Sequence, residues 1–149
     1  MNEKFLRKLF LLMLAFSLLV PTLLAEERVR TKVTVLVASN EGNDFDLVND
    51  EYRDRLINLF SYHSYHEASV QAVELEKARR VKVDLPEGYE LVLTYQGIEN
   101  SRILVQALIR KNSQQYVLTV LSMPEQGVVF LGGPPVGRGV LVIVLETGF

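Results

Sequence analysis

Residues 80–95, RVKVDLPEGYELVLTY, decide the predicted fold class because they describe a β-hairpin from one end to the other. Apolar side chains recur at every second position along both arms, Arg80–Leu85 and Tyr89–Tyr95. Such alternation is typical of strands with one buried face. Pro86-Glu87-Gly88 separates the arms and supplies the residues that tight turns prefer. We therefore predict an antiparallel pair at the centre of this chain.

The same strand signals recur on both sides of the hairpin. Turn residues separate the segments, and the strand centres lie about 10 to 14 residues apart without helical crossovers, which predicts an antiparallel meander. The last segment is apolar at every position from Val140 to Leu145 and should be central in a sheet or covered on both sides, not at an edge. The further predicted strands are Val29–Ala38, Tyr65–Leu75, Arg102–Arg110, Tyr116–Ser122, Gly127–Leu131 and Gly139–Glu146.

One segment changes from the strand period to the helical period. From Asp46 to Phe60, apolar residues recur at three- and four-residue steps, which predicts an amphipathic helix of about 15 residues. Asp44 or Asp46 is the expected N-cap, and the acidic first turn with Asp50 and Glu51 suits the helix dipole. The predicted fold class is α+β: a mostly antiparallel β meander or sandwich with one helix, in a single domain over residues 26–149.

The N-terminal segment, residues 1–25, is typical of a signal peptide. Lys4, Arg7 and Lys8 form a positive region, an apolar core follows, and Ala25 offers the small residue needed before a cleavage point. An uncleaved anchor is the alternative, because roughly 17 apolar residues reach the lower limit for crossing a bilayer. Either alternative predicts an exported domain, periplasmic or extracellular, that contacts the membrane only through this segment and is either released or tethered to the inner membrane.

Composition narrows the function classes. Without residues 1–25, Lys plus Arg falls from 16 to 13 and Asp plus Glu from 18 to 17, so the formal charge is −4. A mildly acidic surface argues against nucleic acid as a partner. The chain has no cysteine, so the exported domain must be stabilised by packing alone and cannot carry a cysteine-linked lipid.

A glycine- and proline-rich segment near the C-terminus, Gly132–Gly139, approaches the phosphate-binding pattern GxxxxGK[ST]. It has Arg138 at the lysine position and Gly139 at the hydroxyl position, and a strand follows it instead of a helix, so we reject a phosphate site. We predict a stiff exposed hairpin loop that serves as a contact surface. The candidate residues on it are Gly132, Gly133, Pro134, Pro135 and Arg138.

The segment Tyr62–His66 contains both histidines and is the second candidate contact surface, with Tyr62, His63, Tyr65 and His66 as its residues. A zinc site needs further ligands that the sequence does not indicate, so no metal and no cofactor are expected. No nucleophile motif is present either, and we assign no catalytic residue.

The strings VTVLVASNEG, LINLFSYHSY, LPEGYELVL and VVFLGGPPVGRGVLVIVLE together resemble a group of small exported bacterial proteins of uncharacterised function. The resemblance spans nearly all of the exported chain and implies no activity. Its matching positions are Ala38, Ser39, Tyr62, Ser64, Tyr65, Gly132, Gly133 and Pro134. A shorter stretch, Gln126–Gly133, is similar to the end of secretin domains, which implies at most an accessory domain of an envelope assembly.

These observations favour a non-enzymatic domain that binds another envelope protein through the 132–139 segment, the Tyr62–His66 segment or an exposed strand edge. The alternative is a carbohydrate-binding module or small glycan-active enzyme, with tyrosines that stack on sugar rings (Tyr62, Tyr65, Tyr89 and Tyr95). Of these, Tyr89 and Tyr95 share a face with Leu91 and Leu93 and are expected to be buried. A structural subunit of a larger assembly is the third hypothesis. The oligomeric state stays open.

Overall fold

The computed structural model describes residue 3, residues 27–46 and residues 52–148. The predicted signal peptide lies outside the described residues apart from Glu3, as does the first part of the predicted helix, residues 47–51. The described elements are β1 (Arg28–Ser39), α2 (Arg53–Phe60), β2 (Ser64–Glu76), β3 (Arg80–Asp84), the 3-10 turn η2 (Pro86–Gly88), β4 (Glu90–Glu99), β5 (Arg102–Lys111), β6 (Gln114–Pro124), β7 (Gly127–Val136) and β8 (Gly139–Thr147).

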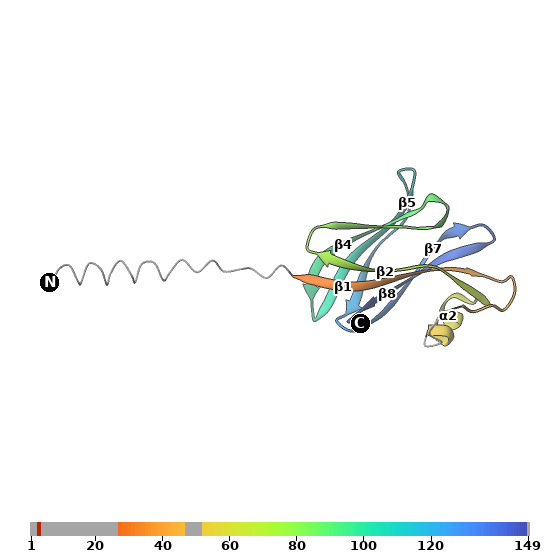
Figure 1. The fold of residues 1–149 in the computed structure, drawn as a ribbon, viewed down its shortest axis with the longest axis horizontal. Helices are drawn as coiled ribbons and strands as arrows, with labels where there is room; N and C mark the ends of the chain where they lie inside the picture. The colour runs from red at the N-terminus through yellow and green to blue at the C-terminus, as the bar shows by residue number, and fades with distance from the viewer. Residues whose placement is uncertain (1–2, 4–26, 47–51, 149) are drawn as a thin grey trace.

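Eight strands form two four-stranded antiparallel sheets that pack as a sandwich (Figure 1). We call the sheet of order β2-β1-β8-β7 sheet A and the sheet of order β3-β4-β5-β6 sheet B. Sheet B is the middle part of the predicted meander, whose other strands β2, β7 and β8 lie in sheet A, and η2 forms the predicted turn between the first two strands of sheet B. In sheet A the first and last strands pair with each other, from Thr31 opposite Thr147 to Ala38 opposite Val140. The mostly antiparallel β fold with a helix is thus confirmed.

The main core lies between the two sheets, where the inward-facing residues of both interdigitate. Sheet A contributes Val33, Val35 and Ile143, all fully buried, and sheet B contributes Leu91 and Ile109. Both faces of β8 are covered, and it lies between β1 and β7 as its apolar sequence predicts. Tyr89 and Tyr95 are buried in this core, which confirms the expectation for these two tyrosines.

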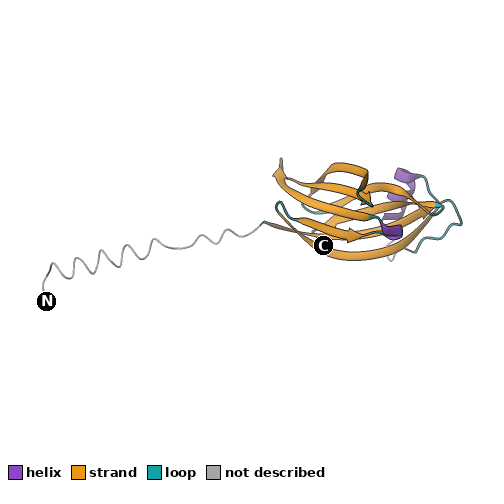
Figure 2. Ribbon diagram, turned by 90° about the horizontal axis from the view of Figure 1, so that it is seen from above, coloured by secondary structure: helices purple, strands orange, loops and turns teal. Residues whose placement is uncertain are grey.

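A second cluster covers the outer face of sheet A, and α2 closes it. We call it the helix-side cluster; its buried members are Leu36, Ala38, Tyr52, Leu56, Tyr65, Val142 and Val144. Helix α2 lies at the end of the sandwich toward which β1 runs (Figure 2). The guanidinium groups of Arg53 and Arg55 lie over the rings of Phe45 and Phe130, at 5.1 and 4.7 Å from the ring centres. These cations therefore extend the cover beyond the apolar stripe of the helix.

The predicted N-cap is wrong. Helix α2 begins at Arg53 after Tyr52 and has no side-chain cap. Asp44 and Asp46 lie before it in a segment that runs beside β2, where Phe45 bridges to Tyr65. Asp46 Oδ1 instead accepts a hydrogen bond of 2.8 Å from the backbone N–H of Glu67. The carboxylate thus satisfies a strand N–H, which sequence periodicity alone does not reveal.

The predicted loop over residues 132–139 is also wrong. Strand β7 continues through both prolines to Val136, and only Gly137 and Arg138 form the turn to β8. Proline is tolerated because β7 is the edge strand of sheet A and a register shift between Gly132 and Pro135 interrupts its ladder. Gly137 has φ of +53°, which suits the first position of a two-residue hairpin turn.

Candidate functional site

The nine predicted contact residues do not form one surface. Tyr65 and Pro134 are buried, whereas Gly132, Pro135 and Arg138 are exposed along β7 and its turn. Gly133 is half-buried; a side chain there would collide with Leu141 of the neighbouring strand, so this glycine serves packing. Of the remaining residues, Tyr62 and His63 lie between α2 and β2, and His66 is the third residue of β2.

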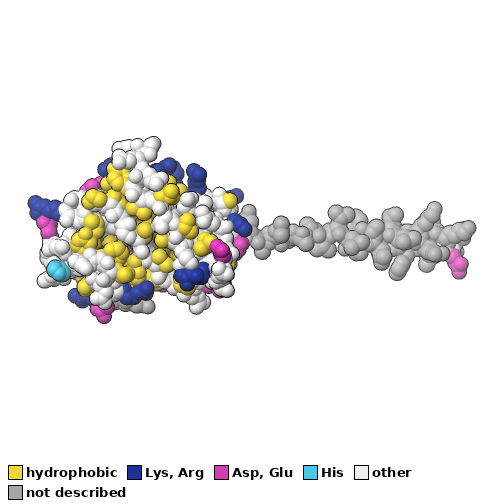
Figure 3. All heavy atoms as spheres, turned by 180° about the vertical axis from the view of Figure 1, so that it is seen from behind, with side chains coloured by type: hydrophobic (Ala, Val, Ile, Leu, Met, Phe, Trp, Pro, Cys, Tyr) yellow, Lys and Arg dark blue, Asp and Glu magenta, His cyan; other side chains and the backbone are white. Residues whose placement is uncertain are grey.

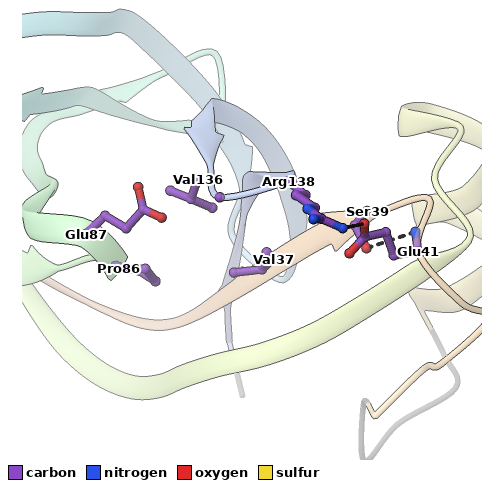
Figure 4. A pocket seen from close by; sticks show the side chains of 9 residues that line it. Val37, Ser39, Glu41, Pro86, Glu87, Val136 and Arg138 are labelled. Atoms are coloured by element: carbon purple, nitrogen blue, oxygen red, sulfur yellow. Dashed lines mark hydrogen bonds and ion pairs between the residues drawn. The ribbon is translucent and has the colours of Figure 1, made fainter.

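The last part of the predicted 132–139 segment lies at the loop end of the sandwich, where β1 ends and where η2 and the β7–β8 turn lie. A shallow hollow of about 300 Å³ opens there (Figure 4). Pro86 and Glu87 form one side, Ser39, Glu41 and Arg138 form the other, and Val37 and Val136 lie between them.

The charges of this hollow are largely compensated. Arg138 Nη1 donates to Glu41 Oε1 at 2.7 Å, and both side chains are exposed, at 83% and 61%. An exposed ion pair of this kind is worth about 0 to 1 kcal/mol. The backbone N–H of Glu41 donates to Ser39 Oγ at 3.3 Å. Because no polar group here is both buried and free to meet a ligand, the hollow makes a weak small-molecule site.

The histidine segment forms a chain of three side chains with the connectivity of a hydrolase triad. His66 Nε2 lies 3.2 Å from Ser64 Oγ, and His66 Nδ1 lies 3.4 Å from Asp46 Oδ2. A serine nucleophile must be open to substrate. Ser64 is fully buried, whereas His66 and Asp46 are about half exposed, so the order of accessibility is the reverse of what hydrolysis needs. This chain instead fastens residues 44–46 to β2.

His63 is exposed and its backbone N–H donates to the carbonyl oxygen of Ser39 at 3.2 Å. It does not join His66 in a ligand set. Across the described residues, no group of three or more histidine, cysteine, aspartate or glutamate side chains is placed to hold a metal ion.

The four tyrosines proposed to stack on sugar rings do not form an exposed platform. Tyr65, Tyr89 and Tyr95 are buried, and Tyr62 is half-buried. Burial raises the pKa of the Tyr65 hydroxyl, which donates to the carbonyl oxygen of Leu56 at 2.8 Å. Burial and the neighbouring Tyr116 raise the pKa of Tyr89. Sugar stacking needs open ring faces, so these residues cannot carry it.

A surface that the sequence did not single out is the outer face of sheet B, defined by Leu104, Leu108, Leu118 and Val120. Leu118 lies opposite Leu108 in the ladder, and both Leu118 and Val120 are 50% exposed. Ile98 and Tyr116, on the same sheet, are 49% and 43% exposed. In the part of the chain that the structure describes, no helix packs on this face as α2 does on sheet A. Apolar side chains also gather over the middle of the face drawn in Figure 3, with charged side chains mostly toward its margins.

A signal for this surface is present in the sequence. Residues 116–121, YVLTVL, are apolar on both strand faces apart from Thr119, much like residues 140–145. The C-terminal run becomes the central strand β8, whereas β6 is the edge of its sheet. A strand with two apolar faces at an edge is the pattern that marks an uncovered surface.

No protein-family model matches the chain, and no curated protein and no solved structure matches it. Within the described residues, none of the helices has the length and apolar character that crossing a membrane requires.

Proposed function

We propose that the chain is an exported, non-enzymatic protein-interaction domain of the cell envelope that binds its partner through the outer face of sheet B. The observation that carries this proposal is the half-exposed pair Leu118 and Val120 on a sheet face without a cover in the described residues. Contiguous exposed apolar side chains on a soluble domain are typical of protein interfaces.

Chemical arguments favour binding over catalysis. The one serine–histidine–aspartate chain in the described residues has a buried serine, and the hollow at the loop end holds a compensated ion pair. Both features stabilise local structure. The apolar face, in contrast, has no structural task in the described chain.

The test is capture of partners from the protein's own envelope after mild crosslinking, read by mass spectrometry. Three tagged proteins are compared: the unchanged chain, a face variant with Leu118→Ser and Val120→Ser, and a loop-end variant with Glu41→Ala and Arg138→Ala. We expect one stoichiometric partner with the unchanged chain and the loop-end variant, and its loss with the face variant. Equal capture by all three, or loss only with the loop-end variant, would contradict the proposed surface.

Export is tested separately by the intact mass of the protein recovered from the envelope or the medium. Cleavage after Ala25 gives a chain that begins at Glu26, and an uncleaved anchor gives the full mass in the membrane fraction. Full-length protein in the cytoplasm would overturn the export part of the proposal.

A further inference from the structure

The four edge strands of the sandwich differ in how they are protected against pairing with another chain. Natural edge strands are commonly protected by charges, prolines or bulges. β3 carries Arg80, Lys82 and Asp84 within five residues. β7 contains two prolines and a register shift. β2 carries glutamates and is paired near Tyr65 by the segment around Phe45.

Strand β6 has none of these protections along most of its length. Its eleven residues, QQYVLTVLSMP, include no charged side chain. Among the described residues, no backbone hydrogen bond outside the ladder with β5 involves β6. Near its end, Arg102 Nη2 donates to the carbonyl oxygen of Ser122 at 2.5 Å, and Nε donates to the Ser122 hydroxyl at 2.6 Å. The free edge therefore lies before Ser122.

We propose that β6 pairs antiparallel with β6 of a second copy of this chain, which joins two copies of sheet B into one continuous sheet. The inference rests on the proposed function and names a second copy of the chain as the partner at the β6 edge of that surface. The absence of charge favours a second copy, because a two-fold pair places each edge against itself and opposes its own charges. In a pair centred on β3, Lys82 would face Lys82; β6 brings no such repulsion.

Symmetry restricts the register. Residues opposite each other in an antiparallel pair point to the same face, and a two-fold axis normal to the sheet keeps outer faces outer. The axis must then pass between the two strands, midway between a residue and its own copy, which lie opposite each other. Tyr116 is the extra residue at the register shift with β5, so the regular free stretch is Val117–Leu121, with Thr119 at its middle.

This register places Leu118 opposite Val120 of the second copy on the outer face. Leu108 already lies opposite Leu118, so the apolar row continues across the axis. Cross-strand apolar pairs of this kind stabilise sheets. The pairing also satisfies the backbone groups of the free edge, and it brings the half-exposed side chains of Leu118 and Val120 into lateral contact with those of the second copy.

The first test measures the oligomeric state of the purified exported chain by size-exclusion chromatography with light scattering over a wide concentration range. We expect twice the monomer mass at high concentration. Val120→Lys places one positive charge from each copy beside the two-fold axis and should weaken dimerisation by about tenfold or more. Val70→Lys is the matched control, because Val70 is 48% exposed on an edge strand of the other sheet. Thermal unfolding of both variants shows that they fold.

The second test uses the absence of cysteine from the chain. Thr119→Cys should give a crosslinked dimer with a short bifunctional thiol reagent, whereas Val70→Cys should not. Crosslinking at Leu118→Cys or Val120→Cys but not at Thr119→Cys would support β6 pairing and overturn the register centred on Thr119.

A monomer at every concentration without crosslinks would overturn the dimer. If the face variant then still loses a different envelope protein, the proposed function stands and only its partner was wrong. If that capture is independent of the face as well, both proposals fail.

Discussion

The outer faces of the two sheets are both apolar, but one of them is buried and the other is half exposed. On sheet A, Leu36, Ala38 and Val144 face outward and are buried under α2. On sheet B, Leu118 and Val120 face outward and are half exposed. In both sheets, these outward-facing residues lie on strands that also carry apolar residues on the inner face of the sheet. The difference teaches that, within the described residues, a helix covers the apolar outer face of sheet A, whereas the apolar outer face of sheet B has no such cover.

Polar contacts hold the cover on sheet A in place. Tyr52, at the start of α2, donates its hydroxyl to Glu146 Oε2 at 2.9 Å, and Lys32 Nζ lies 2.5 Å from the same oxygen. At the other side of the cluster, the Tyr65 hydroxyl binds the helix carbonyl of Leu56. On the outer face of sheet B, the polar contacts of the described residues join neighbouring strands of the same sheet, such as Arg110 with Glu90 at 2.9 Å and Arg102 with Ser122, and they hold no cover in place.

Of the substitutions considered, removal of the central side chain of the helix-side cluster should have the largest effect on the free energy of unfolding. Leu56 is fully buried in the helix-side cluster. Leu56→Ala removes packed methyl groups and leaves a cavity, which should lower the free energy of unfolding by about 2–5 kcal/mol. Urea unfolding followed by far-UV circular dichroism measures this change.

Leu59→Ala on the same helix is the control, because Leu59 is 59% exposed. It should change stability by about 0.5 kcal/mol or less. Equal effects of the two substitutions would show that α2 does not pack on sheet A as described.

The next effect concerns the hydrogen bond that joins β2 to the helix. Tyr65→Phe keeps the ring and removes the hydroxyl that donates to the Leu56 carbonyl at 2.8 Å. The buried carbonyl loses this partner, so the free energy of unfolding should fall by about 1–1.5 kcal/mol. The same urea titration measures it, and an unchanged midpoint would mean that the hydroxyl binds water instead.

The Glu146 contact should make the cover on sheet A depend on pH. Burial by itself would raise the pKa of Glu146, but the Lys32 ammonium and the Tyr52 hydroxyl outweigh it and hold that pKa below its ordinary value. A carboxyl group with a lowered pKa in the folded state stabilises the fold above its ordinary pKa, about 4.3. That contribution is lost as the pH falls through the lower, folded-state pKa.

Glu146→Gln should therefore lower the free energy of unfolding by on the order of 1 kcal/mol at pH 7. At pH 3 the variant and the unchanged protein should differ less in this free energy. Glu41→Gln is the control, since its pair with Arg138 is exposed and should contribute little. Thermal unfolding at the two pH values measures both variants. A Glu146→Gln effect that does not shrink in acid would show that the carboxylate charge is not what stabilises the fold.

The sequence predicts the strands of this fold well because the alternation of their side chains is local. The hairpin around Pro86–Gly88 and the central position of β8 both follow from such patterns. The pairing of β1 with β8 does not, because more than a hundred residues separate Val33 from Leu145 and no local signal joins them. The prediction of a loop over residues 132–139 was wrong because it treated the prolines as the end of the strand. An edge strand such as β7 tolerates proline, since the N–H groups on its free side have no partner strand to pair with.

The candidate site was harder to predict than the fold. Ser64, His66 and Asp46 meet only because residues 44–46 run beside β2, and the sequence does not show that contact. The apolar pattern of residues 116–121 is visible in the sequence, yet its meaning depends on whether the strand is central or at an edge. Only the sheet order distinguishes β6 from β8.

The smallest expected change in the free energy of unfolding comes from a substitution on the outer face of sheet B. Leu118→Thr replaces a side chain that is 50% exposed with a β-branched polar one that suits a strand. At low concentration, where the chain is monomeric, the free energy of unfolding should change by about 0.5 kcal/mol or less. At high concentration the unchanged protein gains stability from association and the variant does not, so their melting temperatures should separate as concentration rises. A loss comparable with that of Leu56→Ala at low concentration would mean that the protein covers both of its apolar faces, and the contrast between the two sheets would fail.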